Sequence, residues 1–234
     1  MSEAVKWRED ADRLRIVSES WTTEETLQWA FNTYGDEVAV ATALGPEGIV
    51  LLDIGTKICH RPGVFIIDTG YLFPETLELV ERIERRYGIR IERIRASVEE
   101  EAQTPANGLK LWQWNPNECC RIRKIEPLRK KLEGMHAWIT AIRRDQTPHR
   151  QTAGRVQWDT RFGLVKVNPL VDWTAEMVWA YIRSHHLDYN PLHDRNYPSI
   201  GCVHCTRPVC QSESERAGRW PGFAKLECGL HGAD

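Results

Sequence analysis

Four short apolar runs recur along the chain, separated by stretches in which apolar residues have a helical spacing. The runs are predicted to be strands, and they cover residues 38–41, 64–67, 89–94 and 138–142. Short apolar runs bounded by turn residues are typical of strands buried in a parallel sheet. Strands that alternate with helices predict an α/β fold, with a parallel twisted sheet flanked by helices and ligands at the carboxyl ends of the strands.

The helices are predicted from apolar spacing and from the residues at their ends. Residues 1–20 are charged with scattered apolar positions, which indicates a helix packed on the outside. Thr22 followed by Glu25 is a capping-box pattern, and Gly35 is expected to end the helix that it begins. The other predictions are helices from Ile49, from Pro74 to Tyr87, from Cys119 and from Thr174, and a hairpin or edge strand between Arg155 and Val167.

Composition narrows the class of protein. The 234 residues are 41% hydrophobic, which suffices for one sizeable core, and the formal charge of −2 gives no net attraction to nucleic acid or to a membrane. No run approaches the 18 apolar residues of a membrane span and no signal peptide is recognisable, so we expect a cytoplasmic protein. In a reducing compartment, seven cysteines favour metal binding or catalysis over structural disulfides. The final thirty residues lack periodicity and predict a flexible arm.

Candidate anion-binding residues follow three of the predicted strands. Thr42 and Gly45 belong to a turn-rich loop between a strand and a helix, where backbone N–H groups can surround an anion. Asp68-Thr69-Gly70 ends the second strand, although spacing alone favours a turn or helix-cap role for Asp68 over a binding role. Arg143 and Arg144 follow the fourth strand, where guanidinium groups fit an oxyanion or phosphate.

The cysteines fall into two pairs and three single residues. Cys119-Cys120 and Cys202-x-x-Cys205 together supply four thiols, and spacing alone favours structural zinc. Adjacent cysteines point apart, however, and span a polynuclear iron–sulfur cluster more easily than one tetrahedral ion. Cys59 is expected to be a buried apolar residue, and Cys210 is a rival ligand near the second pair.

Three motifs together resemble the assimilatory adenylyl-sulfate reductases, the cluster-bearing relatives of the phosphoadenylyl-sulfate reductases. They are Cys-Cys-x-x-x-Lys from Cys119 to Lys124, Cys-x-x-Cys from Cys202 to Cys205, and Glu-Cys-Gly-Leu-His from Glu227 to His231. The Asp-Thr-Gly and Arg-Arg-Asp-Gln segments agree, as do Arg216 and Arg219 before the tail. The resemblance extends from about Val38 to His231.

The resemblance implies an adenine-nucleotide α-hydrolase-like fold that reduces adenylyl sulfate to sulfite and AMP, with reduced thioredoxin as electron donor. It implies a [4Fe-4S] cluster on the four paired cysteines and Cys228 as the nucleophile that forms a thiosulfonate. Residues 1–214 would form the reductase domain and 215–234 the arm that carries this cysteine. The implied substrate-binding residues are Thr42, Gly45, Asp68, Thr69, Gly70, Lys124, Arg143, Arg144, Arg216, Arg219 and His231.

Some alternatives remain at this stage. The 3′-phosphorylated substrate, or both substrates, would fit the same chemistry, and the sequence allows a homo-oligomer. The loop at residues 41–46 contains one hydroxyl, at Thr42, where the family usually has serines. An adenylating enzyme acting on tRNA would need a Ser-Gly-Gly-x-Asp-Ser loop, which the sequence lacks. A zinc-stabilised nucleotide-binding module would leave the Glu-Cys-Gly-Leu-His tail without a purpose.

Overall fold

A mostly parallel sheet forms the centre of the molecule. The computed structural model describes residues 3–97, 108–225 and 227–231. Within that part of the chain, the sheet has six strands in the order β3-β2-β1-β4-β6-β5. The strands are β1 (Val38–Thr42), β2 (Gly63–Ile67), β3 (Ile91–Ile94), β4 (Ala137–Ile139), β5 (Val156–Asp159) and β6 (Leu164–Val167). Every neighbouring pair is parallel except β5 and β6, which form the predicted hairpin at one edge.

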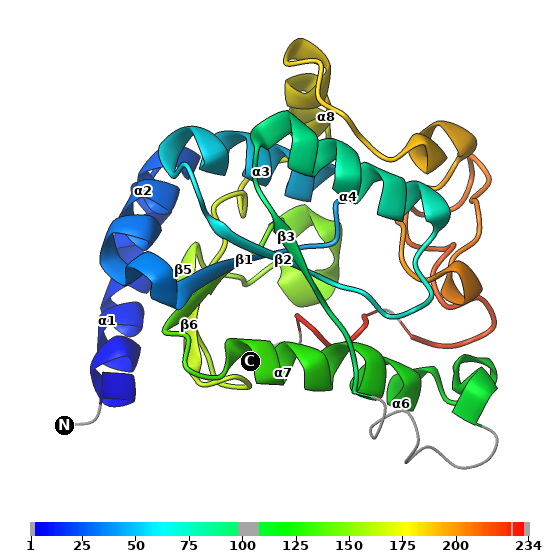
Figure 1. The fold of residues 1–234 in the computed structure, drawn as a ribbon, viewed down its shortest axis with the longest axis horizontal. Coiled ribbons are helices and arrows are strands. Elements are labelled where there is room, and N and C mark those ends of the chain that lie inside the picture. The colour runs from blue at the N-terminus through cyan, green and yellow to red at the C-terminus, as the bar shows by residue number, and fades with distance from the viewer. Residues whose placement is uncertain (1–2, 98–107, 226, 232–234) are drawn as a thin grey trace.

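Helices cover both faces of this sheet (Figure 1). The α-helices are α1 (Glu3–Val17), α2 (Thr23–Tyr34), α3 (Pro46–Ile58), α4 (Pro74–Tyr87), α6 (Pro116–Cys120), α7 (Glu126–Leu132) and α8 (Ala175–Ser184). Short 3₁₀ turns are η1 (Ser18–Ser20), η2 (Gly35–Glu37), η3 (Gly108–Gln113), η5 (Arg144–Gln146), η6 (Pro148–Arg150), η7 (Pro191–Arg195) and η8 (Val203–Cys205). A π-helical turn, η4 (Arg121–Ile125), joins α6 to α7. The predicted α/β class, a parallel sheet flanked by helices, is confirmed.

The side chains of each strand alternate between two hydrophobic cores. In β1, Val38 and Val40 join the core that includes α2, α3 and α4, whereas Ala39 joins the core under α7. In β4, Trp138 faces α7 while its neighbours face the other way. This period of two follows from the pleat of a strand, and it explains why the central strands β1, β2 and β4 are almost entirely apolar.

The largest differences between predicted and observed element ends lie next to the functional site. Helix α3 begins at Pro46, before the predicted Ile49, because proline at the first helical position needs no N–H partner. Strand β4 ends at Ile139 instead of Ile142, where the chain leaves the sheet toward the functional site. The cysteine pair at residues 119–120 ends α6 and does not begin a helix. The capping box of Thr22 and Glu25 is present at the start of α2 as predicted.

A buried carboxylate ties three helices together behind the sheet. Asp53 of α3 accepts hydrogen bonds from the hydroxyl of Tyr87 at 3.0 Å, from the hydroxyl of Tyr181 at 2.8 Å and from Lys57 Nζ at 2.6 Å. Burial would raise the pKa of Asp53, but the hydrogen bonds from Lys57 and the two tyrosines outweigh it and lower that pKa. The charged carboxylate therefore fixes α3, whose first turn reaches the functional site.

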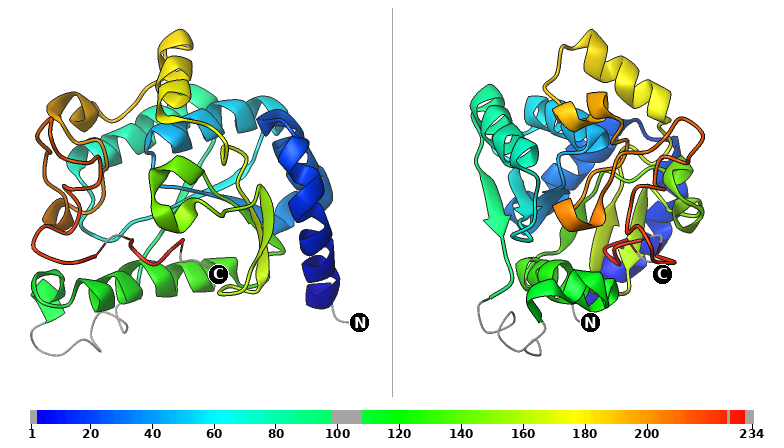
Figure 2. Two further views of the ribbon diagram at one scale, coloured as in Figure 1. Left: turned by 180° about the vertical axis from the view of Figure 1, so that it is seen from behind. Right: turned by 90° about the vertical axis from the view of Figure 1, so that its right-hand side faces the viewer.

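The chain order creates a switch point between β1 and β4. From β1 the chain moves to β2 and β3 on one side, and β4 later pairs with β1 on the other side. Ligands of such sheets bind where the connections diverge, outside the carboxyl ends of the strands. The C-terminal segment crosses this region and runs beside α7 (Figure 2), where Leu230 packs against the core that contains Leu128. Among the helices that the structure describes, none has the length and apolar character to cross a membrane.

Candidate active site

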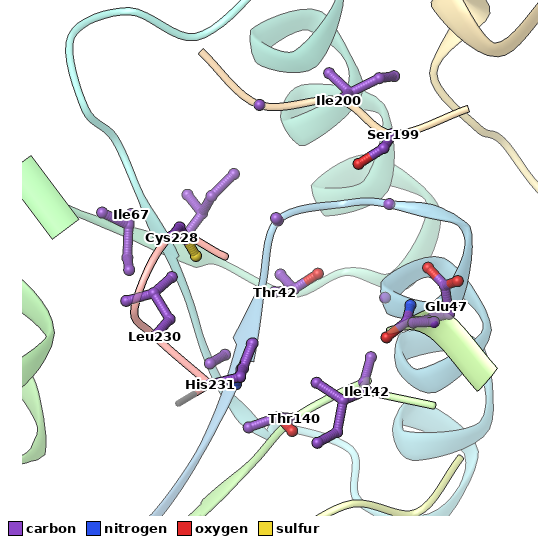
Figure 3. A pocket seen from close by; sticks show the side chains of 18 of the residues that line it. Thr42, Glu47, Ile67, Thr140, Ile142, Ser199, Ile200, Cys228, Leu230 and His231 are labelled. Atoms are coloured by element: carbon purple, nitrogen blue, oxygen red, sulfur yellow. The ribbon is translucent and has the colours of Figure 1, made fainter. Parts of the chain in front are cut away.

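A cavity of about 270 Å³ lies at this switch point. Its walls come from the ends of β1, β2 and β4, from the first turn of α3, from residues 198–202 and from the C-terminal segment. Figure 3 shows Cys228 and Leu230 beside Ile67, across the cavity from Glu47. Of the predicted site residues, those that line the cavity are Thr42, Gly45, Thr69, Lys124, Arg143, Cys202, Arg216, Arg219, Cys228 and His231.

The loop after β1 is shaped by its hydroxyl and its glycines. Thr42 Oγ1 accepts a hydrogen bond from the backbone N–H of Leu44 at 3.0 Å, and Leu44 adopts a left-handed conformation with φ of 53°. Gly48 lies so close to Thr42 Oγ1 that a Cβ at this position would collide with it. The first turn of α3 thus reaches the cavity, and its N-terminal end favours negative charge. The single hydroxyl of this loop supports the loop itself.

In the Asp68-Thr69-Gly70 turn, two residues stabilise the turn and one lines the cavity. Asp68 Oδ1 accepts from the Gly70 N–H at 2.9 Å, and Gly70 has a φ of 74°, so both residues hold the turn and neither lines the cavity. The hydroxyl of Thr69 lies 3.2 Å from the Sγ of Cys202. Of these three residues, which were all predicted to bind substrate, Thr69 alone lines the cavity.

The four paired cysteines converge on a second, very small cavity of about 10 Å³ next to the first. Each is at most 9% exposed, and all seven cysteines of the chain are free thiols. Burial, followed by the charge of the neighbouring thiols, raises the pKa of Cys119 to about 12 and that of Cys205 to about 11. Four buried thiols of this kind need a cation to become thiolates together. In the described residues, no three His, Cys, Asp or Glu side chains are grouped closely enough for one metal ion.

An aromatic stack closes the outer side of this cysteine cavity. The rings of Trp112 and His204 are stacked with centroids 4.2 Å apart and an interplanar angle of 5°. Tyr71 meets the other side of His204 at 4.9 Å, and the guanidinium of Arg123 lies 4.4 Å from the centre of the Tyr71 ring. All four residues line the cysteine cavity, so the stack separates it from solvent. Cys210, the rival ligand, is exposed and does not line this cavity, and Cys59 is half-buried where a buried residue was expected.

Lys124 lies between the two cavities and lines both. Burial would lower the pKa of Lys124, but the nearby thiols of Cys202, Cys120 and Cys228 outweigh it and raise that pKa, so the amine stays protonated. Burial would likewise raise the pKa of Cys228, yet Lys124, a backbone hydrogen bond of Leu230 and then Arg219 lower it. The geometry thus combines a buried cation with a thiol whose thiolate is favoured, which is the usual state of a nucleophilic cysteine.

The basic wall of the larger cavity is built from arginines with defined partners. Arg143 is 3% exposed and is held by Glu47 at 2.9 Å and by Asp145. Arg219 donates to Ser199 Oγ at 3.0 Å and lies over the Trp220 ring. Burial lowers the pKa of Arg216, although a guanidinium remains charged at any ordinary pH.

Arg144 was predicted to bind substrate, but it does not line the cavity. Its side chain donates to Ala153 O at 2.8 Å and pairs with Glu19 Oε2 at 2.6 Å, away from the cavity. Arg143 is extended, whereas Arg144 begins the turn η5, so the two side chains leave the backbone in different directions and Arg143 is the one that lines the cavity.

His231 is a neutral, packed side chain in this arrangement. Its ring stacks on Trp138 with centroids 5.7 Å apart. Burial, helped by the positive charge of Lys166, Arg150 and Arg216, lowers the pKa of His231 well below its ordinary value. Sequence reasoning missed two residues that line the same wall, Arg150 and Glu227, which pair with each other at 3.0 Å. Glu227 was visible as the residue before Cys228 in the tail motif, whereas Arg150 follows no predicted element.

Comparison with known proteins agrees with this geometry. Residues 37–208 match the phosphoadenosine phosphosulfate reductase domain family. The chain belongs to this reductase family. All four paired cysteines and Lys124 fall inside the stretch that carries the family match, and the tail with Cys228 follows it.

Individual relatives share most of this reductase chain. It is 48% identical over 208 residues to adenosine 5'-phosphosulfate reductase 2 of Bacillus subtilis, covering 88% of each protein. It is 44% identical over 228 residues to the phosphoadenosine 5'-phosphosulfate reductase of Gloeobacter violaceus, covering 95% of each. Among solved structures, the phosphoadenylyl-sulfate reductase of Candida auris in complex with phosphate has a TM-score of 0.72 and 30% identity over 88% of this chain and 98% of that one. An FMN adenylyltransferase of Candida glabrata, 16% identical over 85% of this chain and 64% of that one, with a TM-score of 0.60, shares the fold alone.

Proposed function

We propose that this protein reduces adenylyl sulfate to sulfite and AMP, with Cys228 as the nucleophile and reduced thioredoxin as the electron donor. The observation that carries the proposal is the position of Cys228, inside the switch-point cavity and beside Lys124 and Arg219. Relatives that are 45–48% identical and named adenosine 5'-phosphosulfate reductase support the same activity. Residues 1–214 form the reductase domain in this proposal, and 215–234 form the arm that supplies the thiol.

The first step is a displacement at sulfur. The Cys228 thiolate attacks the sulfur of the sulfate group, a new S–S bond forms, and the bond from sulfur to the bridging oxygen breaks. AMP leaves with the electron pair of that bond, and the enzyme retains an S-sulfocysteine. Lys124, Arg143, Arg216 and Arg219 offset the negative charge of the substrate, which an anionic thiolate could not otherwise approach.

The second step is a thiol exchange. A thiolate of thioredoxin attacks Sγ of Cys228, sulfite leaves, and a mixed disulfide joins the two proteins. The second thiol of thioredoxin then breaks this disulfide, so that its dithiol supplies the two electrons and Cys228 returns to the thiol form. A reducing cytoplasm would suit both this donor and the seven free cysteines.

The four paired cysteines are proposed to hold a [4Fe-4S] cluster. The donor set fits this group, because four buried thiols line one cavity and Lys124 and Arg123 offset negative charge there. The adjacent pair Cys119-Cys120 suits a polynuclear cluster more than one tetrahedral zinc ion, because neighbouring side chains point apart. When bound, the cluster would tie the two cysteine segments together and place its charge beside Lys124. The remaining candidate contacts, Thr42, Gly45 and Thr69, are proposed to bind the substrate at the strand ends.

The proposal is tested by an anaerobic sulfite-release assay with adenylyl sulfate and reduced thioredoxin, on protein whose iron and acid-labile sulfide are quantified. Cys228→Ser should abolish sulfite release and labelling of the protein by substrate with radioactive sulfur, while iron content stays unchanged. Cys210→Ser is the matched control, since Cys210 is an exposed thiol outside both cavities. Sulfite release by Cys228→Ser at a near wild-type rate would refute the assignment of the nucleophile.

The choice between the two substrates needs its own measurement. One relative of similar identity is named phosphoadenosine 5'-phosphosulfate reductase, so the comparisons include both activities. We expect a higher kcat/KM for adenylyl sulfate than for its 3′-phosphorylated form. A charge-assisted contact to the extra phosphate would be worth about 1.5–3 kcal/mol, enough for a tenfold preference or more. A higher kcat/KM for the phosphorylated substrate would reverse the assignment.

A further inference from the structure

The carboxylate next to Cys228 is bound on three sides. Glu227 Oε1 accepts a hydrogen bond from the Thr147 hydroxyl at 3.0 Å. Glu227 Oε2 accepts from Arg150 at 3.0 Å and lies 3.4 Å from a guanidinium nitrogen of Arg216. The side chains of Glu227 and Arg150 are only 11% and 9% exposed. Ion pairs this deeply buried are screened much less by salt than those on a surface.

The partners of Glu227 are themselves fixed, so the contact defines one position of the tail. The guanidinium of Arg150 also donates to Gln146 Oε1 at 2.5 Å, and the same oxygen accepts from the backbone N–H of Arg143 at 3.0 Å. On the other side of the tail, Lys225 Nζ donates to Asn117 Oδ1 at 2.7 Å. The tail is thus tethered to the basic wall at Glu227 and to the start of α6 at Lys225.

We propose that Glu227 is a positioning residue, whose ion pairs with Arg150 and Arg216 hold the tail closed and keep Cys228 inside the cavity. Adenylyl sulfate as the substrate rests on the function proposed above, whereas the closed position of the tail does not depend on which substrate is bound. The carboxylate has to leave Arg150 before Cys228 can move out to a second thiol. Gly222 and Gly229, both with φ of 86°, flank the tethered segment and provide positions where the backbone can rotate. Closure for the first step and release for the second therefore depend on one carboxylate.

The test measures access to Cys228 without any substrate. Anaerobically purified holoenzyme is alkylated with iodoacetamide, a neutral reagent, and the Cys228 peptide is quantified by mass spectrometry over time. Because the charge of Glu227 itself raises the pKa of Cys228, rates are compared at the high-pH plateau, where the thiol is fully ionised in every variant. Glu227→Gln should raise the plateau rate roughly tenfold to a hundredfold, the effect of losing a charged hydrogen bond.

Two further sets of variants separate closure from other effects. Glu213→Gln is the matched control, because Glu213 forms a bidentate pair with Arg207 outside the cavity, and its plateau rate should equal that of wild type. Thr147→Val should also raise the rate, and it should add nothing in the Glu227→Gln background, since both changes break the same closure. Equal plateau rates for Glu227→Gln and wild type would overturn the proposal.

Steady-state kinetics supply a second readout. Glu227→Gln should lower kcat by about tenfold without raising the KM for adenylyl sulfate, because the thiol is displaced and the basic wall is retained. A variant that raises KM and keeps kcat would mean that Glu227 binds substrate, and the positioning role would be wrong. The alkylation result holds whatever the substrate is, so failure of the proposed function and failure of the closure are distinguishable.

Discussion

Gly48 offers a sharp test of how the loop after β1 is built. Alanine at this position, in the first turn of α3, would place its Cβ closer than 3.0 Å to Thr42 Oγ1, nearer than real Cβ atoms approach. Thr42 cannot turn away freely, because its hydroxyl accepts the hydrogen bond from Leu44 N–H and its χ1 angle is restricted by β-branching. The collision has to be relieved by losing this hydrogen bond or by shifting the loop.

The expected cost follows from these contacts. Losing the hydrogen bond to Leu44 costs about 1 kcal/mol. An off-rotamer Thr42 adds about 1 kcal/mol. The higher helix propensity of alanine raises the free energy of unfolding by at most about 1 kcal/mol relative to glycine. Gly48→Ala should therefore lower the free energy of unfolding by about 1–2 kcal/mol, which for a chain of this size lowers the Tm by about 2–8 °C.

The assay combines urea or thermal unfolding with the KM for adenylyl sulfate, which should rise severalfold as the loop moves. Gly55→Ala is the control in the same helix, because its Cβ would meet only Phe31 Cζ, at 4.0 Å, and it should be neutral or slightly stabilising. In the Thr42→Ala background the collision partner is gone, so Gly48→Ala should no longer destabilise. The reasoning is refuted if Gly48→Ala leaves both stability and KM unchanged, or if its cost is the same with and without Thr42.

Three further outcomes are expected. The carboxylate of Asp53 has a lowered pKa in the folded state, so the stability that it contributes is complete above the unfolded-state pKa near 4 and is lost as the pH falls through the folded-state pKa. In urea unfolding at pH 7, Asp53→Ala should lower the free energy of unfolding by about 3–5 kcal/mol, whereas Asp194→Ala, at an exposed position, should lower it by under about 1 kcal/mol. The alkylation rate of Cys228 should rise with pH, and the pH at which it is half-maximal should lie below that of an ordinary thiol. Lys124→Gln should raise this pH, and an unchanged value would contradict the stabilisation of the thiolate by Lys124. His204→Ala opens the aromatic stack, so the visible absorbance of the proposed [4Fe-4S] cluster should be lost faster in air than in wild type, while the iron content of anaerobic protein is unchanged. Equal rates of loss would show that the stack does not limit access to the cysteine cavity.

Most of the fold was predictable because its signals are local. The strand runs at residues 38–41 and 64–67 are buried on both faces and therefore apolar at every position. Glycine after Tyr87 adopts the left-handed conformation that ends α4, as the sequence suggested. The end of β4 was missed because Ala141 and Ile142 are as apolar as the strand itself, so the sequence does not mark where the strand ends.

The site was less accessible to sequence reasoning because it depends on which way side chains turn. Arg143 and Arg144 have the same chemistry, and only packing against Glu47 or Glu19 decides which of them meets the cavity. The ion pair of Arg150 and Glu227 joins residues 77 positions apart, and no sequence pattern predicts such a pair. The cysteine pairs were recognisable because their chemistry is rare, although their convergence became visible only in three dimensions.

The π-helical turn between α6 and α7 explains why Cys119 and Lys124 are five residues apart in the sequence. In a π turn, residues five apart occupy the same face, where an ordinary α-helix would bring residues four apart together. Cys119 and Lys124 therefore both reach the cysteine cavity, although a separation of five residues does not fit an α-helical period. Removing one residue from 121–123 would leave Lys124 four residues after Cys119, which is the α-helical spacing, so the π turn could become an α-helix with Lys124 still on the side of Cys119. A one-residue deletion within 121–123 should therefore be better tolerated than a one-residue deletion inside α7, which would turn one side of that helix relative to the other by roughly 100°.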